Sequence, residues 1–152
     1  MNQIKIASSY SDDDRQAMLG WLREFNAAHN GEFMRSLSEG AEKEFLLIAS
    51  DKGQAVGGLM GSTLHHWLKI NMMAVSPTFR GLGIGRQLVT EAEKRAVARD
   101  CRFSYVDTMS FQAPGFYTSL GFDEVGRLAN WDSNGHDKIF FSKMLSSNAL
   151  ES

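Results

Sequence analysis

The stretch VSPTFRGLGIGRQLV, residues 75–89, decides the fold, because it places three glycines between a strand pattern and a helix pattern. Gly81, Gly83 and Gly85 alternate with other residues, and Arg80 and Arg86 flank them. The first amides of a helix have no partner within the helix and lie at the positive end of its dipole. Glycine lets an anion approach those amides, and arginine adds charged donors. The stretch therefore predicts an anion site that suits a pyrophosphate.

A glycine-rich turn also has a simpler explanation, a tight connection whose glycines serve packing and whose arginines face solvent. Two familiar nucleotide-binding motifs do not match it. No Gly-Lys-Ser/Thr follows, so a P-loop lysine is missing. Arg86 stands where a dinucleotide-binding fingerprint needs its last glycine. A plain nucleotide-binding domain stays as an alternative. Such a domain would be protected by ATP and not by coenzyme A.

Hydrophobic periodicity predicts the elements around this turn. The predicted strands are residues 3–8 (QIKIAS), 44–50, 55–64, 67–75, 102–108, 121–128 and 137–145. The predicted helices are residues 11–30, with Ser11 or Asp12 as the cap, a short one over 32–40, one over 83–100, and one that begins near Pro114. This alternation predicts an α/β (α+β) protein with one mixed sheet.

The composition fits one globular domain and excludes several classes of protein. The chain has 152 residues, of which 43% are hydrophobic and 22% are charged. A formal net charge of −2 makes nucleic acid an improbable partner and does not repel a cationic substrate. The single cysteine, Cys101, cannot form an intramolecular disulfide. The start lacks the pattern of a secretory signal and no apolar run is long enough for a bilayer, so we expect a cytoplasmic protein without membrane partners.

Two motifs in order resemble one family. Residues 75–89 resemble the acyl-coenzyme A binding segment of the GCN5-related N-acetyltransferases (GNAT), Arg/Gln-x-x-Gly-x-Gly/Ala, through Arg80, Gly83 and Gly85. The stretch QAPGFYTSLGF, residues 112–122, resembles the later motif of that family, in which an alanine precedes Phe-Tyr and Leu-Gly-Phe. The stretches DTMSFQAPGFY and NGHDKIFFSKML resemble a bacterial subgroup of small single-domain acetyltransferases.

The resemblance implies a GNAT fold, with a mixed, mostly antiparallel sheet of six to seven strands flanked by about four helices. It implies one acyl-coenzyme A N-acyltransferase domain over residues 1–146, with residues 147–152 as a frayed tail. The implied co-substrate is acetyl-coenzyme A, or coenzyme A as its product form, and no metal is expected. The pair His65-His66 is a poor metal site, because neighbours in a strand point to opposite faces.

The resemblance also implies which residues bind the coenzyme. In the family, backbone amides at a bulge of the central strand hold the acyl carbonyl and the pantetheine arm, and an asparagine three residues before the alanine of the second motif helps to hold that arm. Here Ser110 stands in place of that asparagine. The predicted coenzyme-binding residues are Met73, Ala74, Val75, Arg80, Gly81, Gly83, Gly85, Arg86, Ser110 and Ala113.

For the chemistry, the resemblance points to Tyr117, in the position of the tyrosine that protonates the departing thiolate. An aromatic residue in an amphipathic pattern is also typical of a core position. The predicted central strand has no Asp or Glu, so no general base is identified. Candidates for binding the amine or a relay water are His65, His66, Asn71 and Asp107. Candidates for the acceptor pocket are Trp131, Asp132 and His136.

We expect an N-acetyltransferase in which a primary amine attacks acetyl-coenzyme A directly. The expected acceptor is the amine of a small molecule, with a protein amine as the second choice. The alternative is a non-catalytic acyl-coenzyme A binding module with the same fold. A homodimer stays open, because Phe140 and Phe141 suit a core and an interface equally well.

Overall fold

The computed structural model describes residues 3–145, and the chain divides into two compact units, Met1–Ala41 and Glu42–Ser152. The expected tail, residues 147–152, lies outside the described residues. The expectation of one domain over residues 1–146 stays a prediction. Within residues 3–145, no helix is long and apolar enough to cross a membrane.

The N-terminal unit contains two helices, α1 (Asp12–His29) and α2 (Gly31–Ser36). The hydroxyl of Ser11 accepts a hydrogen bond from the backbone N–H of Asp14, and three aspartates occupy the first turn of α1. Both features stabilise a helix start, by capping a free amide and by favourable interaction with the helix dipole. The predicted cap at Ser11 is therefore confirmed.

The strand predicted over residues 3–8 is wrong, because residues 3–10 form no regular element. The alternation of Ile4 and Ile6 is typical of a strand, but a strand needs a neighbour to pair with. Among residues 3–41 no second strand exists to supply one. Local alternation therefore misled the prediction at this end of the chain.

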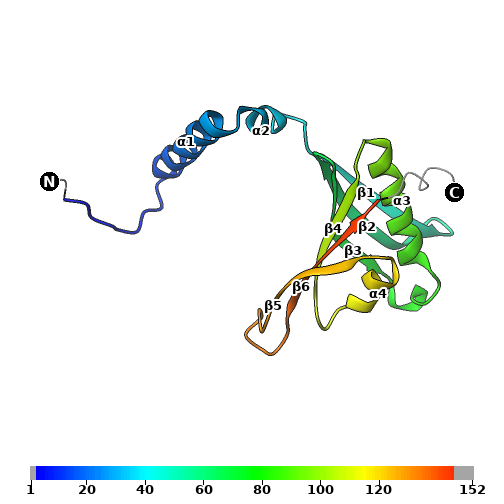
Figure 1. Ribbon diagram of the computed structural model, residues 1–152. Coiled ribbons are helices and arrows are strands. Elements are labelled where there is room, and N and C mark those ends of the chain that lie inside the picture. The colour runs from blue at the N-terminus through cyan, green and yellow to red at the C-terminus, as the bar shows by residue number, and fades with distance from the viewer. Residues whose placement is uncertain (1–2, 146–152) are drawn as a thin grey trace. The chain divides into compact units, whose positions relative to one another are not determined.

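The second unit is built on a six-stranded sheet in the order β1-β2-β3-β4-β6-β5 (Figure 1). Only the β3–β4 pair is parallel, and the other four pairs are antiparallel. The mixed, mostly antiparallel sheet is thus confirmed, with six strands. The strands are β1 (Lys43–Asp51), β2 (Gln54–Leu64), β3 (Trp67–Val75), β4 (Phe103–Met109), β5 (Asp123–Leu128) and β6 (Lys138–Met144).

Two helices follow the parallel strands and pack into one core with the sheet. A short 3₁₀ turn, η1 (Pro77–Phe79), leads from β3 toward α3 (Ile84–Ala98), and α4 (Pro114–Ser119) follows β4. The apolar face of α3 carries Leu88, Val89, Ala92 and Ala96, all buried in one cluster with Phe122 and strand residues. The predicted helices near 83–100 and from Pro114 are confirmed.

β3 has a bulge in its pairing with β2, close to the point where its pairing with β4 ends. In the β2–β3 register Met60 faces Met72 and Gly61 faces Ile70, so Asn71 is the extra residue of the bulge. A Cβ on Gly61 would lie 2.7 Å from the Phe45 ring, so glycine is needed opposite the bulge. The parallel pairing of β3 and β4 is confined to residues 67–69 and 103–105. Beyond these residues the two strands diverge.

Candidate functional site

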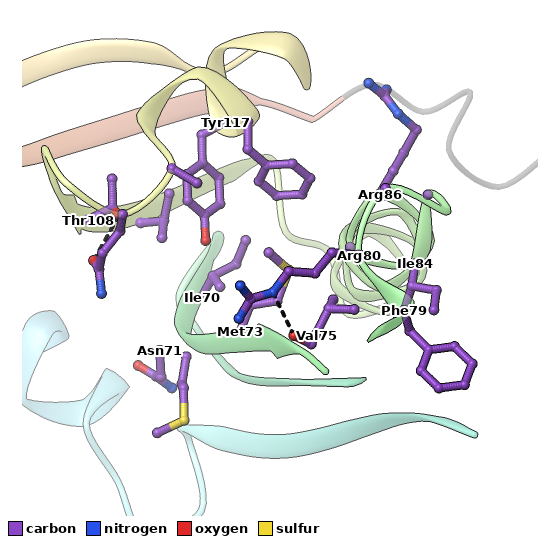
Figure 2. A pocket seen from close by; sticks show the side chains of 18 of the residues that line it. Ile70, Asn71, Met73, Val75, Phe79, Arg80, Ile84, Arg86, Thr108 and Tyr117 are labelled. Carbon is purple, nitrogen blue, oxygen red and sulfur yellow. Dashed lines mark hydrogen bonds between the residues drawn. The ribbon is translucent and has the colours of Figure 1, made fainter. Parts of the chain in front are cut away.

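A cavity of about 760 Å³ opens where β3 and β4 diverge (Figure 2). This volume is in the usual range for the site of a small molecule or coenzyme, a few hundred to roughly 1,000 Å³. Its walls come from β3, the glycine turn, the start of α3, β4 and α4. Of the residues predicted from the sequence, the cavity is lined by Met73, Val75, Arg80, Gly81, Gly83, Gly85, Arg86, Ala113 and Tyr117.

The glycine turn has the geometry of an open cradle at the start of α3. Gly81 and Gly83 have φ angles of 78° and 80°, a region that residues with a Cβ rarely adopt. A Cβ on either glycine would meet no atom within 4 Å, so both face open space. Gly83 caps α3 without any side-chain hydrogen bond, which leaves the first amides of the helix for a ligand.

Gly85 lines the cavity and also has a packing role, and its predicted role toward the coenzyme stays a prediction. It lies inside α3 and is buried, and a Cβ there would lie 3.1 Å from the ring of Phe116 on α4. Its missing side chain therefore lets α3 and α4 pack closely, as in the simpler explanation of the turn. Of the three glycines, only Gly81 and Gly83 need positive φ for the cradle.

The two arginines of the turn point in different directions. The Nε of Arg80 donates to the carbonyl of Val75 at 3.2 Å, which fixes the guanidinium beside the end of β3. Figure 2 shows Arg80 directed into the cavity, whereas Arg86 extends away from it. Arg80 is thus positioned to meet an anion at the cradle, and Arg86 contributes positive charge at the rim.

Tyr117 combines a buried ring with a hydroxyl that points into the cavity (Figure 2). The ring packs edge-on against Phe116 and Phe122, with centroid distances of 5.2 and 5.7 Å. In the described part of the chain the hydroxyl has no hydrogen-bond partner. Burial, and then the charge of Asp107, raise the pKa of Tyr117 above its ordinary value. The hydroxyl therefore keeps its proton at neutral pH and can donate it.

Two polar residues of the cavity were missed from the sequence, Thr108 and Gln112. The side-chain oxygen of Gln112 accepts from the Met109 backbone N–H at 2.8 Å and from the Thr108 hydroxyl at 3.0 Å. These contacts orient the amide and leave its NH₂ group without a hydrogen-bond partner among residues 3–145. The only signal in the sequence was the position of Gln112 directly before Ala113.

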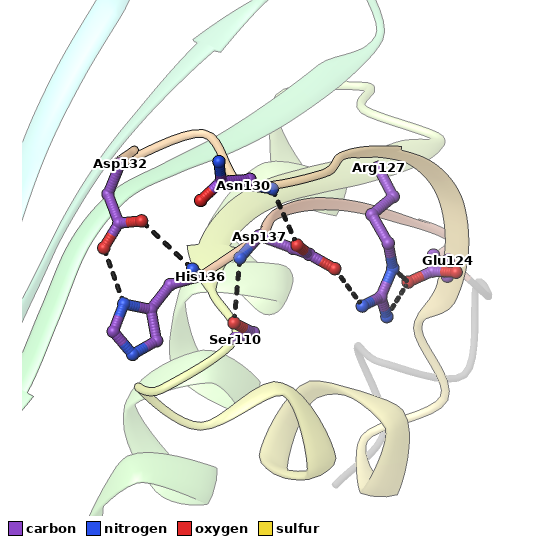
Figure 3. A network of polar contacts seen from close by, with 7 residues as sticks. All are labelled: Ser110, Glu124, Arg127, Asn130, Asp132, His136 and Asp137. Atoms are coloured by element: carbon purple, nitrogen blue, oxygen red, sulfur yellow. Dashed lines mark hydrogen bonds and ion pairs between the residues drawn. The ribbon is translucent and has the colours of Figure 1, made fainter. Parts of the chain in front are cut away.

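Ala74 and Ser110, both predicted to bind the coenzyme, do not line the cavity. The Ser110 hydroxyl accepts from the backbone N–H of Asp137 at 3.0 Å, and the Ser110 N–H donates to the Asp137 carbonyl at 2.9 Å (Figure 3). The Asn130 N–H and the Arg127 guanidinium lower the pKa of Asp137. Ser110 therefore joins a network that holds the loop before β6, and its role toward the coenzyme stays a prediction.

The candidates for the amine separate into two groups. Asn71 and Asp107 line the cavity, from β3 and β4. His65 and His66 lie in the turn between β2 and β3 and do not line it. The Nδ1 of His66 donates to the carbonyl of Asp100 at 2.8 Å. The structure thus brings only the first pair to the place where Tyr117 lies.

The loop between β5 and β6 carries the three residues expected at the acceptor pocket. None of them lines the cavity directly. His136 donates from Nδ1 to Asp132 at 2.6 Å, and its ring packs edge-on against Phe111. Trp131 lies under the ammonium of Lys138, 4.4 Å from the ring centroid. Lys138, the first residue of β6, also lies 3.7 Å from Oδ1 of Asp107, a residue that lines the cavity.

Within residues 3–145 no group of three His, Cys, Asp or Glu side chains could hold a metal ion. The expectation of a metal-independent site stays a prediction.

The chain is similar to known acetyltransferases. The model of the Acetyltransferase (GNAT) family matches residues 9–122. The acetyltransferase Atu2258 of Agrobacterium fabrum is 36% identical over 83 residues, which are 55% of this chain and 61% of that protein. The blasticidin-S acetyltransferase of Streptomyces morookaense is 40% identical over 73 residues, 47% of this chain and 54% of that protein. The matches thus span 61% and 54% of the two relatives.

A solved structure shows the same fold over nearly the whole chain. The crystal structure of an acetyltransferase from Bacillus cereus ATCC 14579 superimposes with a TM-score of 0.75 at 28% identity. The superposition covers 93% of this chain and 98% of that one.

Proposed function

The chain belongs to the acetyltransferase (GNAT) family, and from that premise we propose that it transfers an acetyl group from acetyl-coenzyme A to a primary amine. One observation carries the proposal. A single cavity joins an anion cradle at the start of α3 to the free hydroxyl of Tyr117, between two strands that diverge at a bulge. Transfer of an acetyl group from the coenzyme to an amine needs a site that binds the negatively charged coenzyme. It also needs a group that can protonate the departing thiolate.

The residues that would hold acetyl-coenzyme A follow from the cavity. Gly81, Gly83 and the first amides of α3 would bind the pyrophosphate, with Arg80 as the charged partner. Backbone amides of Met73 and Val75, which lie past the bulge, would receive the acyl and pantetheine region. The coenzyme supplies the activated thioester, and Tyr117 holds the proton that its sulfur needs on leaving.

The acceptor in this proposal is the amine of a small molecule. The name of one relative, blasticidin-S acetyltransferase, supports this choice over a protein amine. A cytoplasmic location stays an expectation from the sequence, and a homodimer stays open.

A thermal-shift series tests the proposal. Acetyl-coenzyme A and coenzyme A should raise the melting temperature, because a ligand that binds only the folded state stabilises it by mass action. ATP and NAD should not. Thiol release on addition of amines then tests turnover. A shift without thiol release for any amine would favour the non-catalytic binding module, and no shift with either coenzyme species would exclude the proposed function.

A pair of variants tests how the coenzyme arm is held. Gln112→Ala should weaken acetyl-coenzyme A binding about three- to tenfold, because the free NH₂ of Gln112 is the amide donor available in the cavity. Ser110→Ala should leave this affinity within about twofold and lower the free energy of unfolding by about 1 kcal/mol, since it loses one hydrogen bond. Calorimetric titration and thermal unfolding measure both. The opposite ranking of the two affinities would return the coenzyme role to Ser110.

A further inference from the structure

We propose that Asp107 binds the ammonium group of the acceptor and that Lys138 is the resident cation which the acceptor displaces from it. The inference rests on the acetyl-transfer function proposed above. It assigns the acceptor to a chemical class, the primary alkylammonium ions, and names the residues that select it.

The sheet places Asp107 and Lys138 on one face. Val106 and Thr108 are buried on β4, so Asp107 between them points to the opposite face. In the β4–β6 register Asp107 is opposite Phe140, and Met109 is opposite Lys138. Residues opposite one another in an antiparallel pair share a face, and diagonal neighbours are within reach of long side chains. The Nζ of Lys138 accordingly lies 3.7 Å from Oδ1 of Asp107.

The charges of the cavity separate into two ends. Among the described residues that line it, Asp107 is the only acidic one, whereas Arg80 and Arg86 lie at the glycine turn. The positive end suits the phosphates of the coenzyme. Opposite charges attract, and this attraction is stronger where water is partly excluded. The negative end therefore favours an acceptor that carries positive charge, and it disfavours an anionic one.

The surroundings of Lys138 show that an alkylammonium group fits beside Asp107. The Lys138 ammonium lies 3.7 Å from Oδ1 of Asp107, 4.4 Å from the centroid of the Trp131 ring and 5.9 Å from the centroid of the Phe140 ring. A carboxylate beside aromatic faces is a favourable environment for such a cation. The Asp107 side chain is 41% exposed and that of Lys138 is 25% exposed, so solvent and ligands reach the pair. An incoming ammonium competes with Lys138 for the same carboxylate.

The other amine candidates fit less well. Asn71 lines the cavity but is neutral, and its amide nitrogen is 3.5 Å from the Ser62 hydroxyl. His65 and His66 do not line the cavity. Asp107 is the candidate that combines charge with a place in the cavity.

The test measures binding of n-butylammonium and spermidine to the protein in complex with coenzyme A, by calorimetry. Aniline, which is uncharged at neutral pH, is the neutral comparison. Asp107→Asn should weaken the binding of both cations about tenfold or more, since a charge-assisted contact is lost. It should leave the affinities for aniline and acetyl-coenzyme A unchanged. The matched control is Asp123→Asn, an exposed aspartate on β5 outside the cavity, with no expected effect.

Lys138→Met should act in the opposite direction. The substitution keeps an unbranched side chain over Trp131 but removes the competing cation. The affinity for n-butylammonium should therefore rise about two- to fivefold, a small change because a partly exposed ion pair contributes little energy. A lower affinity in Lys138→Met would overturn the displacement. Equal cation affinities in Asp107→Asn and the wild type, or no measurable cation binding to the wild type, would overturn the assignment of Asp107. Failure of the wild type to bind acetyl-coenzyme A would instead exclude the acetyl-transfer function and this inference with it.

Discussion

Tyr117→Phe should lower the turnover number about 10²- to 10⁴-fold while acetyl-coenzyme A affinity stays within about twofold. The substitution removes only the hydroxyl, which points into the cavity and has no hydrogen-bond partner among residues 3–145. The phenylalanine ring can keep the contacts with Phe116 and Phe122. Because burial and Asp107 raise the pKa of Tyr117, the hydroxyl is a proton donor throughout the neutral range. Steady-state kinetics and calorimetric titration measure the two quantities.

The matched control for this prediction is Tyr105→Phe. Tyr105 lies on β4 and does not line the cavity, so the loss of its hydroxyl should leave turnover unchanged. Parallel losses of turnover and coenzyme affinity in Tyr117→Phe would indicate a packing role for the ring. Unchanged turnover would exclude Tyr117 as the proton donor.

Gly83→Val should abolish measurable binding of acetyl-coenzyme A. Gly83 has a φ of 80°, and its missing side chain faces open space at the start of α3. Valine would place a branched side chain over the amides that are proposed to bind the pyrophosphate. The backbone conformation would also cost about 1–2 kcal/mol of folding free energy, because residues with a Cβ are strained at this φ. Thermal shift with coenzyme A measures the binding.

Gly53→Val separates a loss of binding caused by a side chain over the amides from one caused by a strained backbone. Gly53 has a φ of 79°, lies in the turn between β1 and β2, and also has no atom within 4 Å of where a Cβ would be. It should therefore show the same loss of stability and normal coenzyme binding. If Gly83→Val retained affinity, or if Gly53→Val lost it equally, the cradle would not be the phosphate site.

The elements of the second unit could be predicted from sequence because their signals are local. The helix over residues 84–98 follows from apolar residues at helical spacing, and β2, β3 and β4 follow from short apolar runs with turn residues between them. A bulge in the central strand was implied only by the family resemblance. Its place became definite once Gly61 was found opposite Ile70, with Asn71 left over.

One predicted strand was wrong and the contacts of two residues were not foreseen, in each case where a residue depends on a distant partner. The alternation at residues 3–8 predicts a strand, but a strand forms only against another strand. Ser110 stands in the position of a coenzyme ligand, yet its hydroxyl accepts from Asp137, 27 residues later. Gly85 fits the anion motif, yet the ring that needs its space is on α4. No pattern within a few residues contains this information.

The sequence by itself determined the family, the order of elements in the sheet unit and the glycine turn at residues 80–86. Helix starts and glycine conformations depend on neighbouring residues, so a short motif specifies them. Only the tertiary structure decided what faces the cavity: the divergence of β3 from β4, the free amide of Gln112 and the contact of Asp107 with Lys138. These depend on strand register and on packing between segments far apart in the chain, and a shift of one residue would turn Asp107 to the other face of the sheet.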